Sequence, residues 1–522
     1  MRSLLSPSKF AVVGILGIVV NQAALFGLTE GLGIHYLVSS ILASQLSTLN
    51  NFVLTEAWVF RGREHRSHVL FRYLVFNLLN ISTLSIRVPV LLLLTEVAGF
   101  HYLVSNLVAI GLTFGIRYLV ADNWIWAGLD RADHVSVGGW FNYDIQSLIR
   151  LQSSVGLPEL AAFNVERSVE PDIVVRRRWL GGRPRFRVKI ERDETDTIHY
   201  REQLGPLSAA FDVRLDDGPI QLDANWLLIW SHHVLYTNMV EPLLRFMLVS
   251  RGHVLLHCAA IEAPEGAVLM SAQTDTGKTS TVLRLLLSHR WGFIADDMAI
   301  VSPRGEVLSF PKPMTLSSHT MSAVNEGVLP PADRFMLAIR SRLHSREGRA
   351  VGHALGRLKL PIVTINAWVQ LFIPPPKYHV TSLIDCRLTD RAQLDAVVLM
   401  ERGVPQLAEE PAMAATLEQL LDNTDDAYTF PPFAAMAPLF RIGGLDYPAL
   451  RVRERQLLAA AVGEARRFRL RIAGHGWADV IPTVLARRDI RSIVLDDLED
   501  REPVGVSGAA ADPSASAASP LD

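Results

Sequence analysis

The sequence predicts a multidomain protein in which a four-helix, all-α transmembrane domain, made of a duplicated hairpin, precedes a cytosolic α/β domain with a phosphate-binding loop. Three observations predict this fold class. The mean hydropathy is +0.22 although 20% of the 522 residues are charged, so apolar residues must be concentrated, and they gather in the first quarter. A basic loop separates two pairs of apolar stretches there. Further along, SAQTDTGKTS (271–280) lies between a strand-like run and a helical run.

Charge and cysteine content narrow the class of protein. The net charge of −2 argues against a dedicated nucleic-acid binder, which would carry a basic excess, so we expect no nucleic-acid partner. Cys258 and Cys386 are too few and too far apart for a disulfide framework, which indicates a reducing compartment for the soluble part. No small-residue cleavage site follows the first apolar run, so we do not expect a cleaved signal peptide.

The first 130 residues contain four apolar stretches long enough to cross a bilayer, which takes about 20 residues. They cover residues 10–28, 36–54, 71–94 and 102–120. The middle loop, RGREHRSH (61–68), holds three arginines, whereas the two outer loops, TEGLGIH and EVAGFH, hold no Lys or Arg. Because basic loops face the cytosol, the sequence predicts a multi-pass membrane protein with both termini and the soluble part in the cytosol.

The transmembrane region repeats itself. Residues 34–60 align without gaps to residues 100–126, they share the run His-Tyr-Leu-Val-Ser, and Trp58 falls on Trp124. A duplicated helical hairpin explains this, and two hairpins of even helix number give a parallel repeat.

Three polar residues within the predicted spans form a candidate polar site of the membrane domain: Asn51, Arg87 and Arg117. Arg87 lies deep in the third span, where a charge is costly and is taken by default as functional. The alternative is that Arg87 snorkels or pairs structurally within the bundle. Arg117 is nearer a cytosolic end, where snorkelling is the favoured interpretation.

Residues from about 8 to 126 resemble the GtrA-like family. The resemblance lies in the four short spans, the repeat and the element NFVLTEAWVF, in which Asn51-Phe52 and Trp58-Val59-Phe60 match the family pattern and Thr55-Glu56 replaces Asn-Arg. The resemblance implies handling or translocation of a polyprenyl-phosphate-linked sugar for cell-envelope polysaccharide synthesis, with membrane lipid as a partner, in a bacterial plasma membrane. The alternative is a plain anchor, but four spans with buried polar groups favour transport or lipid binding.

The segment 131–240 is a strand-rich lead-in of the soluble part. The runs IVVRRRWL and RFRVKI around Gly181-Gly182 predict a hairpin. Its arginine cluster is interpreted as a charged edge that discourages aggregation. Contact with anionic lipid headgroups is the less favoured alternative.

The stretch after the lead-in has the context that a phosphate-binding loop requires. A strand, AVLMSA, precedes the loop and a helix, KTSTVLRLLLSHR, overlaps its end. Backbone N–H groups would hold the phosphates of ATP, Lys278 would reach the β- and γ-phosphates, and Thr279 would bind Mg²⁺. If the first position of the loop needs a positive φ, alanine there would cost about 1 kcal/mol. The predicted nucleotide-binding residues are Ala272, Gln273, Thr274, Asp275, Thr276, Gly277, Lys278, Thr279 and Ser280.

Two adjacent carboxylates end the next apolar strand, in WGFIADDMAIV. Buried charges are costly unless they are paired or used. One of Asp296 and Asp297 would bind Mg²⁺, and the other would accept the proton of an incoming hydroxyl.

Residues from about 241 to 316 resemble the HPr-kinase-like family of P-loop kinases through LLHCAAI, the loop, ADDMAIV and GEVLSFPKPMTL. The resemblance implies a P-loop kinase-like fold in which Asp296 is the general base and Asp297 is a metal ligand with Thr279, and it leaves open the exchange of these two roles. It also places His257 near the reacting phosphate; the alternative is a hydrogen-bonded buried histidine. The acceptor would be a hydroxyl of a small molecule, lipid or peptide, and its identity stays open.

Two rival interpretations remain at this stage. In the first, the loop domain binds nucleotide only as a regulator of a lipid-linked sugar transporter. In the second, it is a binding module held by an inert anchor. The predicted boundaries are 1–130 for the membrane domain, 131–240 for the lead-in, 241–498 for the P-loop domain and 499–522 for a disordered tail. Within the P-loop domain, LDNTDDAYTFPPF (421–433) predicts a loop and residues 451–470 predict one amphipathic helix. The oligomeric state stays open.

Overall fold

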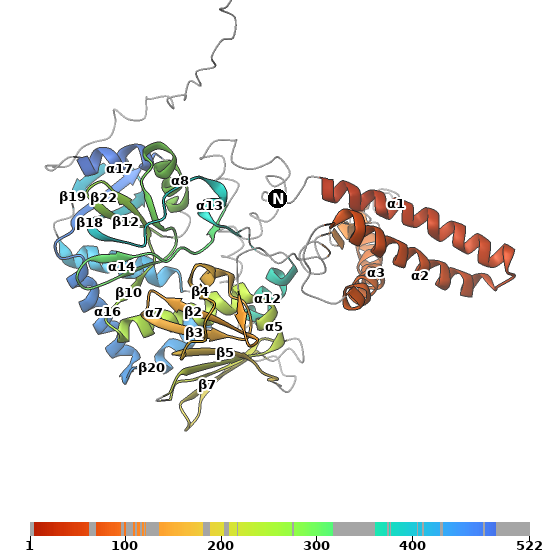
Figure 1. The fold of residues 1–522 in the computed structure, drawn as a ribbon, viewed down its shortest axis with the longest axis horizontal. Coiled ribbons are helices and arrows are strands. Elements are labelled where there is room, and N and C mark those ends of the chain that lie inside the picture. The colour runs from red at the N-terminus through yellow and green to blue at the C-terminus, as the bar shows by residue number, and fades with distance from the viewer. Residues whose placement is uncertain are drawn as a thin grey trace, which may run out of the picture.

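The computed structural model describes most of the chain in blocks. These are residues 5–61, 69–94, 99–100, parts of 108–121, 135–180, 188–202, 208–316 without 217, 274 and 275, and 361–486 without 373, 374, 376, 405, 410, 411, 429–431 and 473–475. The molecule consists of an N-terminal helical region and a C-terminal mixed α/β region rich in sheet (Figure 1). The predicted tail, 499–522, lies outside the described residues.

Three long helices make up the described N-terminal region: α1 (Leu5–Phe26), α2 (Tyr36–Leu54) and α3 (Val69–Leu92). Short π-helical turns, Gly27–Gly31 and Thr55–Val59, extend α1 and α2. At 1.5 Å per residue the three helices are about 28 to 36 Å long, close to the thickness of a bilayer's hydrocarbon core. In the described part of the chain, the helical stretch 9–31 alone passes both a length and a hydropathy criterion for a span. Most of the fourth predicted span lies outside the described residues.

Small and polar residues hold α1 against α2. A Cβ atom on Gly17 would lie 2.3 Å from the Asn51 amide nitrogen, so only glycine permits this approach. The Ser47 hydroxyl donates a hydrogen bond of 2.6 Å to the Gly17 carbonyl. Close backbone approach at small residues is the usual way in which membrane helices associate. An aromatic contact joins α1 to a later part of the region, since the Phe10 ring centroid lies 5.7 Å from that of Tyr118.

The first sheet of the C-terminal region runs in the order β1-β2-β3-β5-β9-β8-β7-β6, with β4 beside β2. Strands β3, β5 and β9 are parallel, and the other pairings are antiparallel. The strands are β1 (Ser136–Val137), β2 (Trp140–Ile145), β3 (Ile149–Ser153), β4 (Asn164–Val165), β5 (Ile173–Arg177), β6 (Val188–Arg192), β7 (Thr197–Glu202), β8 (Ala210–Arg214) and β9 (Ile220–Ala224).

The predicted hairpin around Gly181-Gly182 is wrong. Strand β5 pairs with β3 and β9, while β6 pairs with β7 at the far end of the sheet. The buried side chains of Ile173 and Val175 explain this, since they join the core beneath β9. Burial against distant strands therefore decided the pairing, and the local turn signal did not.

The second sheet runs in the order β10-β14-β15-β18-β12-β11-β13, and β22 joins β18 and β19. Its three central strands, β12, β18 and β22, are parallel, so their C-terminal ends meet at one edge. The strands are β10 (Val254–Leu256), β11 (Ala259–Ala263), β12 (Gly266–Ser271), β13 (Gly292–Ala295), β14 (Ala299–Val301), β15 (Glu306–Leu308), β18 (Arg391–Arg402), β19 (Gln406–Glu409) and β22 (Arg466–Ile472).

Helices cover both faces of the second sheet. Alternate residues of β12 face opposite cores: Val268 and Met270 pack with α8 (Lys278–His289) and α17 (Trp477–Ala486). Ala267 and Leu269 pack on the other side with α14 (Met413–Asp426) and α16 (Tyr447–Ala461). The region is thus a three-layer α/β sandwich (Figure 1), in which period-two burial along the strand serves two helical layers.

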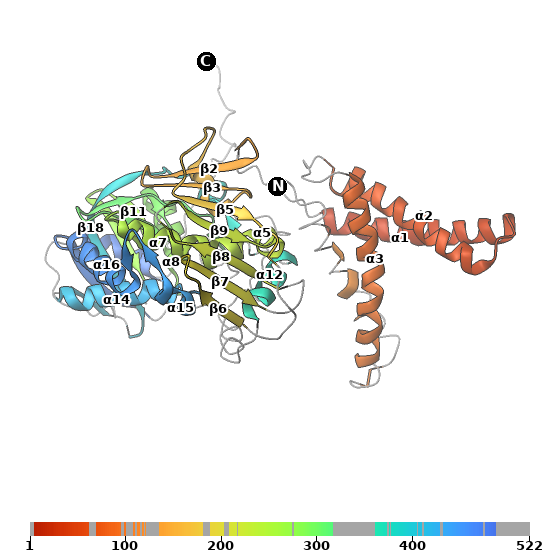
Figure 2. The ribbon, with the colours of Figure 1, turned by 90° about the horizontal axis from the view of Figure 1, so that it is seen from below.

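A continuous core joins the two sheets across the predicted boundary at residue 240. It contains Tyr143 from the first sheet, Phe246 from α7 (Glu241–Ser250) and Ile300 from the second sheet. Figure 2 shows α7 beside the first sheet. The remaining elements connect or cap these layers: η5 (Pro158–Phe163), α5 (Trp226–Trp230), α6 (His232–Leu235), η7 (Tyr236–Val240), β16 (Met314–Thr315), α12 (Ile362–Phe372), β17 (Lys377–Tyr378), α13 (Val380–Leu383), α15 (Phe433–Met436), η8 (Ala437–Leu439), β20 (Arg441–Ile442) and β21 (Leu445–Asp446).

Two further sequence predictions are wrong. Much of the predicted loop 421–433 is the last part of α14, because Leu417, Leu420, Leu421 and Thr424 are buried at helical spacing. The predicted helix over 451–470 ends at Ala461, and its second half forms β22, in which buried residues alternate with partly exposed ones.

Candidate functional site

The predicted phosphate loop lies at the edge where the central parallel strands end. Strand β12 ends at Ser271 and α8 begins at Lys278. Ligands of open α/β sheets bind at this carboxyl edge, beside helix N-termini that attract anions. Gly277 turns the chain into the helix with a φ of 126°, which favours glycine. Thr274 and Asp275 lie outside the described residues.

Ala272, which stands at the first glycine position of the loop, fits without strain. Its side chain is fully buried, and its φ is not positive. The expected conformational cost therefore does not arise, because that cost applies only to a left-handed backbone.

Lys278 folds back over the loop. Its Nζ donates 2.6 Å to the Ala272 carbonyl and lies 3.0 Å from His257 Nε2. Burial lowers the pKa of Lys278, and the charges of Asp297 and Asp296 oppose that shift. An ammonium held among a carbonyl, an imidazole and two carboxylates can be offered to a phosphate that enters the loop.

Thr279 and Asp296 lie where a loop-bound metal ion would be held. The Thr279 hydroxyl donates 2.9 Å to Asp296 Oδ2, and Asp296 Oδ1 has no hydrogen-bond partner in the described part of the chain. Burial, with the charge of Asp297, raises the pKa of Asp296 to about 7. A hydroxyl beside a buried carboxylate with a spare oxygen fits Mg²⁺, which takes one or two protein carboxylates and completes its shell with phosphates and water. The described residues contain no group of three or more His, Cys, Asp or Glu side chains placed to hold a metal ion, so water or phosphate would have to complete its shell.

Asp297 is the accessible carboxylate of the pair, with 43% of its side chain exposed. Its Oδ2 accepts a 2.6 Å hydrogen bond from Lys312, and its Oδ1 lies 3.3 Å from His257 Nδ1. Burial would raise the pKa of Asp297, but Lys312 and His257 hold it well below its usual value. Adjacent carboxylates thus have pKa values pushed apart, a pattern that assigns them different roles.

Lys312 is a site residue that the sequence interpretation missed. Its Nζ donates 2.6 Å to Asp297 and 2.6 Å to Glu241, the first residue of α7. Burial would lower the pKa of Lys312, but the two carboxylates raise it. The available signal was a lysine between two prolines in an apolar stretch, since a buried lysine needs an acidic partner.

Two residues of α14 and one residue of β18 hold the loop and the strands that lead to it. The Thr424 hydroxyl on α14 accepts a 3.2 Å hydrogen bond from the His257 backbone N–H, and Asn423 donates 3.1 Å to the Ser271 hydroxyl. Arg402, at the end of β18, donates 3.2 Å to the Thr276 carbonyl. His257 is therefore both buried and adjacent to Lys278, and burial with the Lys278 charge lowers its pKa.

The N-terminal helices hold a different set of polar groups. Asn51 packs on Gly17, and its Oδ1 has no partner among the described residues. Arg117 is half-buried, whereas the side chain of Arg87 lies outside the described part. The grouping of the three candidate polar residues therefore stays a prediction. At the end of α2, Glu56 pairs with Arg72, whose Nε donates 3.3 Å to it.

Residues 9–126 match the GtrA/DPMS transmembrane domain family. We call them the GtrA/DPMS region. A similar protein is the dolichol-phosphate mannosyltransferase of Pyrococcus furiosus, which is 38% identical over 119 residues. That alignment covers 23% of this chain and 33% of the mannosyltransferase, so the chain spans about a third of this curated relative's length.

The GtrA/DPMS region carries one departure that the structure explains. Glu56 stands at the arginine position of the GtrA-like Asn-Arg element. Its charge is neutralised by Arg72 from the next helix. The Arg72 side chain is 7% exposed, so the pair removes a charge that would otherwise be costly near a bilayer.

Proposed function

We propose that the protein joins a membrane domain that handles a polyprenyl-phosphate-linked sugar to a kinase domain that uses ATP and Mg²⁺ to phosphorylate a hydroxyl group. The family match and the mannosyltransferase relative support the first half. The second half is carried by one observation, the bond between Thr279 and buried Asp296 at the start of α8, under the ammonium of Lys278.

Residues of the loop would hold the nucleotide. The N–H groups at the start of α8 and the Lys278 ammonium would bind the phosphates, because both present positive charge to an anion. Thr279 and Asp296 would hold Mg²⁺, which when bound neutralises the charge that develops on the transferred phosphoryl group. Arg402, at the neighbouring strand end, holds the loop in place through the Thr276 carbonyl.

The geometry favours exchanging the roles that the sequence resemblance gave to the two carboxylates. Asp296 is 5% exposed and bonded to Thr279, which suits a metal ligand. Asp297 is open to an acceptor, and Lys312 binds its Oδ2 at 2.6 Å. Its Oδ1, which has the longer contact of 3.3 Å to His257 Nδ1, would receive the acceptor's proton. A low pKa is tolerable for this role, because a loose phosphoryl-transfer transition state needs an oriented nucleophile more than a strong base.

The topology remains part of the proposal. The basic loop 61–68 favours cytosolic termini and a cytosolic sheet-rich region at a bacterial plasma membrane. The kinase would then act at the membrane surface, on a lipid, a sugar or a peptide that carries the hydroxyl.

The experiment is ATP turnover and acceptor labelling by the full chain in detergent, with the γ-phosphate of ATP labelled. We expect Lys278→Ala to abolish the reaction, because it removes the cation that contacts the β- and γ-phosphates. Lys189→Ala is the matched control, since Lys189 is exposed on β6 and its ion-pair partner among the described residues is Glu191. A wild-type protein that neither binds nor hydrolyses ATP would refute the kinase. ATP binding without transfer to any acceptor, combined with ATP-dependent transport, would instead favour the regulatory interpretation.

A further inference from the structure

A polar pocket lies on the face of the first sheet that points away from its core. It encloses about 400 Å³ over β5, β9, β8 and β7, far along the chain from the phosphate loop. Strand alternation builds it: Phe211 and Val213 of β8 enter the core, and Asp212 and Arg214 line the pocket. None of the site residues described above lines this pocket.

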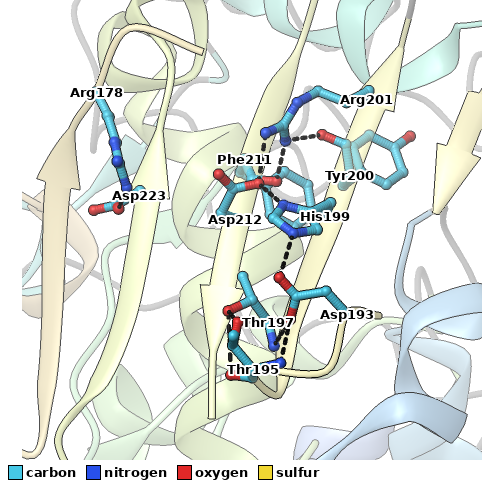
Figure 3. Close-up of polar contacts among 10 residues, drawn as sticks. All are labelled: Arg178, Asp193, Thr195, Thr197, His199, Tyr200, Arg201, Phe211, Asp212 and Asp223. Carbon is cyan, nitrogen blue, oxygen red and sulfur yellow. Dashed lines mark hydrogen bonds and ion pairs between the residues drawn. The ribbon is translucent and has the colours of Figure 1, made fainter. Parts of the chain in front are cut away.

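Hydrogen bonds among the lining residues fix their side chains in one arrangement (Figure 3). The His199 ring is held between two carboxylates, with Nδ1 2.8 Å from Asp212 and Nε2 3.1 Å from Asp193. Arg201 also binds Asp212, at 2.6 Å, and Arg178 binds Asp223 at 3.0 Å. A preorganised polar array loses little conformational entropy when a ligand binds.

The array contains a pairing that a merely structural sheet would avoid. Asp212 and Asp223 are direct cross-strand partners on β8 and β9, and like charges in that position destabilise a sheet. Arginines from neighbouring positions compensate, since Arg176 and Arg178 both bind Asp223. Natural sequences break a local rule of this kind mainly at functional sites.

One lining cation is left over. Arg214 makes a hydrogen bond of 3.5 Å to the Gln221 side chain, and among the described residues it forms no ion pair with a carboxylate. Its cross-strand neighbour on β9 is that same neutral Gln221. A guanidinium with open donors is suited to a carboxylate or phosphate, which it can bind with two parallel bonds.

Trp179 gives the pocket an aromatic wall. It directly follows Arg178, and 84% of its surface is exposed. An exposed tryptophan has no packing reason of its own, but its flat apolar face can cover the C–H face of a sugar ring. The remaining lining groups, carboxylates, guanidinia, threonines and an imidazole, supply the donors and acceptors that sugar hydroxyls require.

We propose that this pocket binds a saccharide that carries one anionic group, a carboxylate or a phosphate. Trp179 covers the sugar ring, Arg214 binds the anionic group, and the His199 array receives the hydroxyls. The sheet-rich region would then bind acidic sugars. This proposal does not depend on the kinase activity proposed for the loop site.

The test is ligand-observed NMR with the full chain in detergent micelles and four probes: glucuronic acid, glucose 6-phosphate, glucose and inorganic phosphate. We expect at least one of the two acidic sugars to bind with a Kd of about 1 mM or tighter, and glucose and inorganic phosphate to bind at least about tenfold more weakly, since each lacks one of the two contacts. Comparison of the two acidic sugars tells a carboxylate from a phosphate preference.

Variants locate the binding. Arg214→Gln and Trp179→Ala should each weaken the acidic sugar at least about tenfold, and Trp179→Phe should recover part of the loss. Arg167→Gln is the matched control, because Arg167 is an exposed arginine that pairs with Asp144 outside the pocket. All four variants should bind ATP as wild type does, which separates this pocket from the loop site. The proposal is overturned if neither acidic sugar binds, or if binding survives both Arg214→Gln and Trp179→Ala.

Discussion

The GtrA/DPMS region and the phosphate-loop site differ in how their buried polar groups are paired. Among the described membrane helices, Asn50, Asn51 and Thr55 each have a buried polar atom without a partner. At the loop, buried charges form a continuous chain in which Lys278 contacts His257 and Lys312 joins Asp297 to Glu241. Open polar atoms leave a place for a ligand, whereas a paired chain fixes protonation states before a ligand arrives. The loop site also leaves Asp296 Oδ1 without a partner among the described residues, at the place proposed for the metal ion. The comparison teaches that the GtrA/DPMS region leaves neutral polar atoms open, whereas the loop site pairs most of its charges and leaves an oxygen open at the proposed metal position.

Breaking the charge chain should have the largest effect. Lys312→Met leaves the Glu241 carboxylate, whose side chain is 3% exposed, without its cation. We expect the free energy of unfolding of the sheet-rich region to fall by about 3–5 kcal/mol, the usual result of breaking a buried ion pair. Denaturant unfolding followed by near-ultraviolet circular dichroism measures it.

The control for this prediction is Lys189→Met, which breaks an exposed pair and should change stability by less than about 1 kcal/mol. The double variant Lys312→Met with Glu241→Gln should recover part of the loss. If Lys312→Met is as stable as wild type, the contacts of Lys312 with Asp297 and Glu241 do not stabilise the fold.

The second largest effect should come from overpacking the contact between α1 and α2. Gly17→Val places a side chain where even a Cβ atom would meet the Asn51 amide at 2.3 Å, so α1 and α2 must separate. We expect a loss of about 1–3 kcal/mol, as for other overpacked interfaces, measured by unfolding in increasing fractions of denaturing detergent. Gly14→Val is the matched control, since nothing lies within 4 Å of a Cβ there. Equal effects of the two valines would show that the Gly17 contact is unimportant.

The smallest expected effect is the pH dependence of metal binding, which we expect at the loop site. Because the pKa of Asp296 is raised to about 7, the folded protein holds a proton there that a metal ion must displace. Metal affinity should therefore rise up to about tenfold per pH unit below 7 and level off above it. Without metal, the same raised pKa lowers the free energy of unfolding as the pH rises from the ordinary value of 3.8 towards about 7.

Mn²⁺ binding followed by electron paramagnetic resonance without nucleotide checks this dependence. Asp296→Asn should remove it. The pKa values of Asp297 and His257 are both lowered, which moves them away from the raised pKa of Asp296. A pH dependence that survives in Asp296→Asn would mean that another group holds the metal.

The sequence predicted the local parts of this molecule better than its long-range contacts. The apolar stretches of the N-terminal region can be recognised from the sequence because hydropathy is a property of consecutive residues. The family match over 9–126 confirms the GtrA-like resemblance. The loop could be placed between strand and helix for the same reason. The pairs Lys312–Glu241 and Thr424–His257 could not be predicted, because their members lie 71 and 167 residues apart and no local pattern joins them.

The wrong predictions have related causes. The segment 421–433 is rich in residues that favour turns, yet the apolar stripe of Leu417, Leu420 and Leu421 packs against the sheet and carries the helix as far as Asp426. Tertiary burial overrode local propensity there. At Ala272 the local pattern suggested strain, because phosphate loops usually have glycine at that position. The backbone there does not have a positive φ, so the strain does not occur.

The most direct test of the central claim is mass spectrometry of products formed by the full chain with ATP, Mg²⁺ and a membrane extract. We predict a phosphorylated hydroxyl compound that wild type makes and that neither Lys278→Ala nor Asp297→Asn makes. Loss in Asp297→Asn with ATP binding intact would assign the acceptor-facing role to Asp297. If wild type yields no phosphorylated product, or if Asp297→Asn yields as much as wild type, the account of this site is contradicted.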